Sequence, residues 1–247
     1  MDTRSILTKT MLFATISGIL FLFQGCNIGS SHVISGDGNV ITATHQLDHF
    51  KTINISGMYN MKLTEGRESK VMLETDENIH DLTDIHVKNN TLYISSKEKG
   101  IIRPTKLEMI IIYEDLEKIT IGGACRLESE GPVSVEKLKI NVSGAADINL
   151  ELDVEELVTQ IEGAANIVYK GVAGKHLADL SGASQLRAEN LQTGMSRIHL
   201  SGAGAAHVYV TGSLHATLSG LGSITYHGEP EEIFTARSGL GRIRKAD

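Results

Sequence analysis

A short motif recurs along this chain and limits its possible folds more than any other feature. Segments such as INVSGAADI (140–148), TQIEGAANI (159–167) and ADLSGASQL (178–186) share one frame, with a glycine that has an aliphatic residue two positions before it and another four positions after it. After a first interval of 66 residues the motif returns every 18 to 21 residues, so the unit is about 19 residues long. The glycines that mark the frame are Gly57, Gly123, Gly144, Gly163, Gly182, Gly202, Gly220 and Gly239.

The residues around each of these glycines alternate between apolar and polar, which is typical of strands with one buried side. Helix is the competing interpretation, but a glycine in every unit would weaken helices, and no long stretch has a helical period. The unit is too short for a propeller blade and lacks the leucine-rich pattern. The sequence therefore predicts an all-β fold, a parallel β-helix or solenoid with coils of about 19 residues whose equivalent positions stack in columns.

The Ser-Gly-Ala core of the motif predicts a tight corner at the same place in every coil. Small residues leave room for the next coil to stack, and glycine adopts backbone conformations that other residues avoid. Replacing Gly182 by valine is expected to break the stack. Cys125 takes a place that Ala146, Ala165 and Ser184 fill in later units, so we interpret it as a small buried residue and not as a nucleophile.

The 66-residue interval departs from the repeat. Residues 70–74, 91–95 and 107–113 have the composition of strands, and Asn89-Asn90 predicts a hairpin turn. We expect this interval to form a small N-terminal β cap. At the other end, basic residues are expected to keep the open edge of the last coil from pairing with another chain: Arg237, Arg242, Arg244 and Lys245.

The N-terminus has the order of a secretion signal. Arg4 and Lys9 precede an apolar run (11–23) that ends before Gly25-Cys26, and this run is shorter than the roughly 20 residues of a membrane-spanning helix. We predict cleavage before Cys26 and attachment of a lipid to it. The residues before Gly25 differ from the usual lipobox, so ordinary cleavage to a soluble secreted protein is the alternative. The predicted organisation is a signal peptide (1–25), a lipidated N-terminus and linker (26–45), an N-terminal β region with the first coil and cap (46–118) and a repetitive solenoid (119–247).

Composition and motifs argue against several kinds of chemistry. The net charge of −7 disfavours nucleic acid, and the chain has neither a metal-binding cysteine pair nor a nucleotide-binding glycine motif, so no cofactor is expected. An enzyme acting on polysaccharide is the catalytic alternative for a β-helix. Asp147, Glu162 and Asp179 fall at different places in their units, however, and would not share one column. We therefore predict that the chain is not an enzyme.

One set of residues could support binding. The position three residues before the glycine is polar in successive units, and stacking would place these side chains in a single outward ladder. A flat polar ladder suits a glycan or the surface of an envelope protein, whereas a hydrated face without a ligand is the simpler alternative because aromatic residues make up only 4% of the chain. The predicted ladder consists of Asn141, Gln160, Asp179, His199 and Thr217.

The repeated Ser-Gly-Ala units, the lead-in Phe50-Lys51-Thr52-Ile53 and the signal sequence resemble the bacterial family of putative autotransporter adhesins with a head GIN domain. The resemblance covers roughly residues 40–245 and implies a right-handed β-helix, with Cys26 as the lipid site. It implies no catalytic residues. The predicted function is that of a non-enzymatic lipoprotein of the cell envelope, adhesin-like or structural, held to the outer membrane by its lipid on the inner face or at the surface. A periplasmic scaffold or envelope-stress accessory protein is the alternative.

Overall fold

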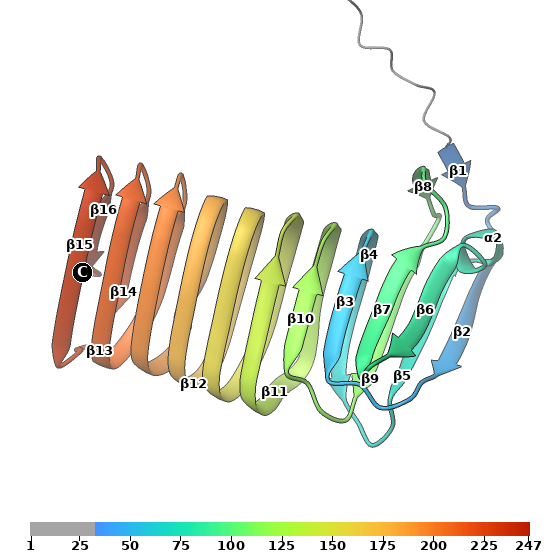
Figure 1. Cartoon of the computed structure of the whole chain (residues 1–247), viewed down its shortest axis with the longest axis horizontal. Coiled ribbons are helices and arrows are strands. Elements are labelled where there is room, and N and C mark those ends of the chain that lie inside the picture. Colours follow the sequence, from blue (N-terminus) through green and yellow to red (C-terminus); the bar gives the residue numbers. More distant parts are fainter. Residues whose placement is uncertain (1–32) are drawn as a thin grey trace, which may run out of the picture.

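The computed structural model describes residues 33–247, which contain sixteen strands and one four-residue helix (Figure 1). In chain order the elements are β1 (Val33–Ser35), β2 (Val40–Gln46), β3 (Thr52–Ser56), β4 (Met58–Glu65), β5 (Lys70–Asp76), α2 (Glu77–His80), β6 (Thr83–Lys88), β7 (Thr91–Ser96), β8 (Ile101–Arg103), β9 (Leu107–Tyr113), β10 (Lys118–Ile121), β11 (Ala124–Val142), β12 (Ala145–Gly202), β13 (Ala205–Gly220), β14 (Ser223–His227), β15 (Glu232–Gly239) and β16 (Arg242–Lys245). Fourteen strands belong to one sheet, and β1 pairs only with β8.

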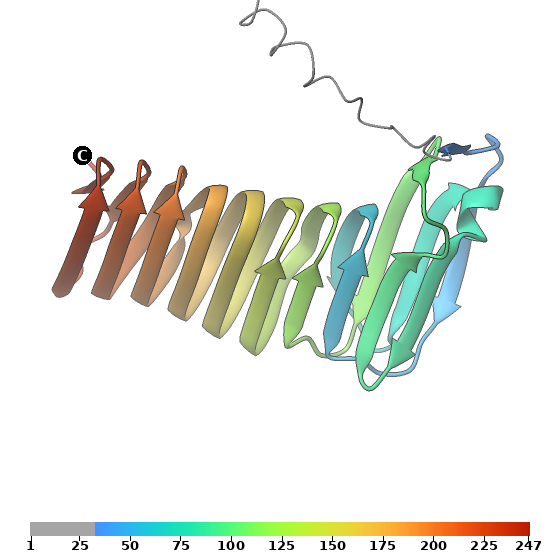
Figure 2. The same cartoon turned by 45° about the horizontal axis from the view of Figure 1, so that its top comes forward.

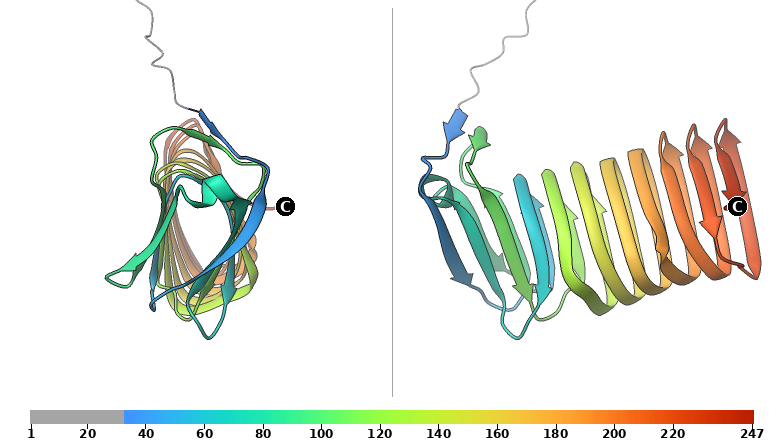
Figure 3. Two further views of the ribbon diagram at one scale, coloured as in Figure 1. Left: turned by 90° about the vertical axis from the view of Figure 1, so that its right-hand side faces the viewer. Right: turned by 180° about the vertical axis from the view of Figure 1, so that it is seen from behind.

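From β10 to β16 every pairing is parallel. Ile119 of β10 lies beside Ile140 of β11, and Ile140 lies beside Thr159 of β12, so partners are 21 and 19 residues apart in the sequence. The strands form a row that runs the length of the molecule, from green to red in Figures 1 and 2. Viewed from its end, the sheet curves around a central core (Figure 3).

The N-terminal strands continue this sheet with a different pairing. β3 and β4 join it in parallel to β10 and β11. Beyond them, β5 is antiparallel to both β2 and β9, and β6 is antiparallel to β7. The predicted hairpin turn is present, because Asn89 and Asn90 join β6 to β7 with φ angles of 51° and 57°. The strands predicted at 70–74, 91–95 and 107–113 are β5, β7 and β9.

These pairings correct the predicted fold class. A right-handed parallel β-helix or solenoid is wrong, because the strands of the predicted N-terminal cap continue the same sheet and its pairing is mixed. The protein is all-β, with one sheet that curves into a nearly closed, barrel-like wall (Figure 3). The physical reason lies in the non-repetitive interval, where the hairpin at Asn89-Asn90 makes β6 antiparallel to β7 and where β5 pairs antiparallel with the distant strands β2 and β9. The segment predicted as a linker (26–45) also contains β1 and most of β2.

The motif glycines occupy corners that leave no space for a side chain. At Gly182 the backbone φ is +90°, and a Cβ atom would lie 2.5 Å from the carbonyl oxygen of Gly163 in the preceding unit. The same overlap occurs between Gly202 and Gly182, and between Gly220 and Gly202. We call this series of stacked positions the corner column. Its glycines are therefore required by the close approach of one backbone to the next.

Inward-facing residues form one continuous apolar core, which also contains a cluster of three side chains with polar groups. Thr159, Tyr169 and His176 are fully buried, and the Thr159 hydroxyl lies 3.2 Å from His176 Nε2 and 3.4 Å from the Tyr169 hydroxyl. The Nδ1 atom of His176 has no hydrogen-bond partner among the described residues. Burial lowers the pKa of His176 to about 4, so this ring is neutral near pH 7.

The two ends of the sheet are closed in different ways. At the N-terminal end Asp76 has no exposed surface, and its carboxylate accepts hydrogen bonds from the backbone amides of Gly38 at 2.8 Å and Thr105 at 2.7 Å. These bonds tie the β1–β2 connection and the β8–β9 connection to the end of β5. At the C-terminal end Arg237 pairs with Leu218, which is a core position, and donates a hydrogen bond to the carbonyl of Gly241. A charged side chain thus lies where the last unit is open.

Candidate functional site

The five residues of the predicted ladder lie in one outward column. Asn141 is directly beside Gln160, and His199 is directly beside Thr217. Asp179 lies between these pairs within β12, three residues before Gly182, and the corner glycines of successive units stack on one another. All five side chains are at least partly exposed.

The column extends beyond the repeat. Thr120 lies beside Asn141, Asn54 beside Thr120, and Tyr93 beside Asn54. His86 of β6 pairs with Tyr93 and ends the series. We call the surface formed by this column and its outward neighbours the ladder face. It crosses both the parallel units and the N-terminal strands.

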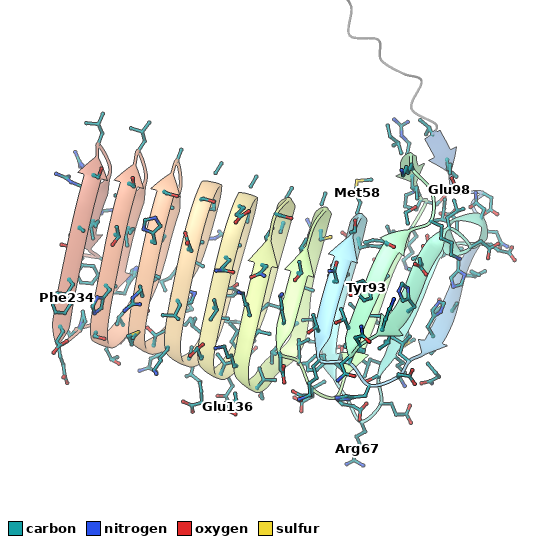
Figure 4. All side chains as sticks on the ribbon, viewed as in Figure 1. Met58, Arg67, Tyr93, Glu98, Glu136 and Phe234 are labelled. Atoms are coloured by element: carbon teal, nitrogen blue, oxygen red, sulfur yellow. The ribbon has the colours of Figure 1, made fainter. Side chains whose placement is uncertain are left out.

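An aromatic stack lies at each end of the ladder face. The rings of His86 and Tyr93 are 5.3 Å apart with an interplanar angle of 16°, and those of His215 and Phe234 are 4.7 Å apart at 29°. Phe234 is 55% exposed, and Figure 4 shows Tyr93 and Phe234 on the same side of the molecule. Flat aromatic rings beside amide and hydroxyl groups are suited to packing against sugar rings while hydrogen bonding their hydroxyls.

Sequence reasoning missed both aromatic stacks. Tyr93 lies in the non-repetitive interval, and Phe234 lies outside the nine-residue motif around Gly239. The alternation in Thr91–Ser95 places Tyr93 outward, and counting five residues back from Gly239 places Phe234 in the column of His215. These two signals could have identified the platforms.

A second polar series runs along the opposite wall of the sheet. The Asn166 side chain donates to Asp147 at 3.2 Å and accepts from Arg187 at 2.9 Å, and Arg126 lies 3.7 Å from Asp147. Beside this series is an open furrow of about 840 Å³ whose floor is formed by small residues of successive units. The furrow is shallow because the positions after each corner glycine are mostly alanine.

The described residues do not assemble catalytic carboxylates or a metal site. Asp147 belongs to the furrow wall, Asp179 to the ladder, and Glu162 adjoins the corner column. Within residues 33–247 no group of three His, Cys, Asp or Glu side chains is placed to hold a metal ion. Cys125 is buried as predicted, and burial raises the pKa of its thiol. Cys26 lies outside the described residues.

The sequence matches the family described as "Putative auto-transporter adhesin, head GIN domain" over residues 49–230. The chain belongs to this family. The matched region of this head GIN domain protein includes the ladder face except Phe234, the furrow and most of the parallel units. Residues 33–247 contain no helix long and apolar enough to cross a membrane.

Solved structures share the fold of this head GIN domain protein. A putative adhesin from Bacteroides fragilis has 24% identity and a TM-score of 0.80, with 86% of this chain and all of that chain covered. A putative lipid binding protein from Parabacteroides distasonis has 21% identity and a TM-score of 0.74, covering 87% and 100%. A putative adhesin from Parabacteroides merdae has 20% identity and a TM-score of 0.70, covering 87% and 99%. No curated protein sequence matches the chain. The family and two of these structures are described as adhesins and not as enzymes.

Proposed function

We propose that this protein is an adhesin-like, non-enzymatic binding module of the cell envelope, anchored to the outer membrane by a lipid on Cys26, with the ladder face as its binding surface. The observation that supports this proposal best is the continuous polar column with an aromatic stack at each end. Family membership supports the adhesin-like part, and the apolar run before Gly25-Cys26 supports the anchor.

The proposed ligand of the ladder face is a glycan. Amide, hydroxyl and imidazole groups recur along the column at the strand spacing of about 4.8 Å, so an extended polymer lying across the strands could meet several of them. Exposed Phe234 and partly exposed Tyr93 provide two rings on which sugar rings could pack.

Glycan binding is tested by applying the purified full-length lipoprotein in detergent to an array of immobilised polysaccharides and isolated peptidoglycan. Tyr93→Ala and Phe234→Ala are each expected to weaken binding about tenfold, which corresponds to about 1.4 kcal/mol. Leu240→Ala is the matched control, since it removes an exposed apolar side chain away from the ladder face. Equal affinities of all three variants, or no binding to any polysaccharide, would overturn the glycan assignment and favour a protein partner.

The side of the membrane is tested by treating intact cells with protease and comparing the wild type with Cys26→Ala. Loss of the wild-type protein from intact cells would support an adhesin at the surface. Protection in intact cells, together with release of the Cys26→Ala form into the soluble fraction, would support the anchor and favour the internal scaffold.

A further inference from the structure

Three of the large exposed apolar side chains, those of Met58, Leu221 and Leu240, lie along one edge. The residue that follows each corner glycine points outward, and its amide bonds to the corner glycine of the preceding unit, as with Leu221 on Gly202 and Leu240 on Gly220. We call this series of outward residues the corner ridge. It consists of Met58, Ala124, Ala145, Ala164, Ala183, Ala203, Leu221 and Leu240.

Every position of the corner ridge is exposed and apolar. Met58 is 54% exposed, Leu221 71% and Leu240 85%, and the five alanines between them, which line the furrow, are exposed as well. With eight strands spaced about 4.8 Å apart, the corner ridge is about 34 Å long. The strip carries large exposed side chains at both ends, Met58 at one and Leu221 and Leu240 at the other, which indicates an interaction surface.

The opposite edge of the sheet has the contrary character. Arg67 and Glu136 project from it in Figure 4, while Met58 projects from the edge that carries the corner ridge. Ion pairs join residues along the charged edge, including Lys51 with Asp115 at 2.8 Å and Lys137 with Glu156. The charged edge is therefore suited to water, and the edge with the corner ridge is suited to an apolar environment.

The described chain begins on the side of the corner ridge. β1 and β8 lie at that edge in Figures 1 and 4, and they add exposed Val33 and Ile101 to the apolar surface. Cys26 is seven residues before Val33, so the chain between them can span at most about 25 Å. A lipid on Cys26 would thus hold this edge close to a bilayer.

We propose that the corner ridge lies on the lipid bilayer, with Met58, Leu221 and Leu240 entering the headgroup region. The proposal rests on the proposed lipid anchor at Cys26. Exposed Lys99 and Arg103 flank Ile101 and could contact anionic headgroups. An amphipathic edge that lies in the interface adds a second contact to a single lipid chain, which alone gives reversible binding.

The absence of tryptophan from the sequence provides a direct test. Leu240→Trp introduces a single tryptophan on the corner ridge, whose emission is excited selectively over that of tyrosine, and Glu136→Trp is the control on the charged edge. Each full-length lipoprotein is reconstituted into vesicles of phosphatidylethanolamine and phosphatidylglycerol, with or without brominated acyl chains. We expect a blue-shifted emission that the brominated lipid quenches for Leu240→Trp, and a water-like, unquenched emission for Glu136→Trp.

Two results would overturn the proposal in distinguishable ways. In the first, both variants sediment with the vesicles, but their tryptophans stay unquenched or are quenched equally. This result would support the lipid anchor and exclude contact between the corner ridge and the bilayer. Failure of the wild-type protein to sediment with vesicles would exclude the anchor and the ridge together.

A second tryptophan variant tests whether the whole corner ridge contacts the bilayer or only the surroundings of Leu240 do. Met58→Trp lies at the far end of the corner ridge, and its quenching is expected to fall by at least half when Leu221→Asp and Leu240→Asp are added. Both leucines are largely exposed, so these substitutions leave the core unchanged, and thermal unfolding checks this. Quenching at Met58→Trp that is unaffected by the added charges would contradict a ridge that binds as one surface.

Discussion

The parallel units and the N-terminal strands build one sheet by different means. In the parallel units, backbone lies against backbone at the corner column, and each unit depends on the one before it. In the N-terminal strands, chain reversal at Asn89-Asn90 and the buried carboxylate of Asp76 set the arrangement. Tolerance to substitution is therefore expected to depend on close stacking in one region and on local turns and hydrogen bonds in the other.

The largest effect is expected at the corner column. Gly182→Val combines a positive φ with a Cβ that would lie 2.5 Å from the Gly163 carbonyl oxygen, and should cost about 3 kcal/mol or more of the free energy of unfolding. Gly131→Val is the matched control, since Gly131 has a φ of +89° but no atom within 4 Å of its Cβ position, and should cost about 1–2 kcal/mol. Equal losses in denaturant unfolding would show that conformation, and not stacking, determines the corners.

The buried histidine should make the parallel units sensitive to acid. The folded pKa of His176 is about 4, below its ordinary value of 6.5, so the unfolded chain takes up a proton first as the pH falls. Stability present above pH 6.5 should decrease by about 3 kcal/mol as the pH falls to 4. Leu138 and Leu157 lie six residues before their corner glycines, as His176 does, so His176→Leu introduces the residue found there in two other units and should flatten this part of the pH profile. An unchanged profile in the variant would assign the acid sensitivity to other groups.

In the N-terminal strands the largest effect is expected at Asp76. Burial alone would raise the pKa of this carboxyl, but hydrogen bonds from Thr105 and the Gly38 amide outweigh it and hold the pKa below its usual value. Asp76→Asn removes one acceptor, and should speed hydrogen exchange at Gly38 and Thr105 while the amides of β12 keep their protection. The stabilising contribution of Asp76 should be present above the ordinary carboxyl pKa and be lost as the pH falls through its lower folded value. Faster exchange throughout β12 would show that the two regions unfold together.

The smallest effect is expected at the hairpin. Asn89 has a φ of 51°, which alanine adopts less readily, so Asn89→Ala should cost about 1 kcal/mol. Asn90→Gly should be neutral or slightly stabilising, because glycine accepts the positive φ of this position. Thermal unfolding of both variants checks the turn type, and a larger loss for Asn90→Gly would contradict it.

The sequence predicted the parts of the fold that depend on local spacing. Apolar residues two before and four after each corner glycine identified inward positions, and Asn89-Asn90 identified a hairpin. The pairing of β2 with β5 was not predicted, because it joins Val40 to Asp76 and no motif connects these residues. Antiparallel pairing within the sheet followed from those distant contacts, so the predicted fold class was wrong.

The candidate site, like the fold, could be predicted from the sequence only in part. The ladder from Asn141 to Thr217 could be predicted because a constant offset from the corner glycines places its members in one column. The stack of His86 on Tyr93 requires the pairing of β6 with β7 and of β7 with β3, which spacing alone does not provide. The corner ridge could not be predicted for another reason, since alanine after each corner glycine fits a tight turn equally well, and only the stacking of successive units places Leu221 and Leu240 in the same series.

The corner column also determines how proteins of this kind can differ in length. The corner glycines have no side chains, so successive units meet at this column only through backbone atoms. These contacts do not depend on which unit lies next to which. Duplication or loss of one unit would change the span by about 4.8 Å while leaving the strands at both ends as they are. With the corner ridge on the bilayer, a longer relative would cover more membrane area without standing taller above it.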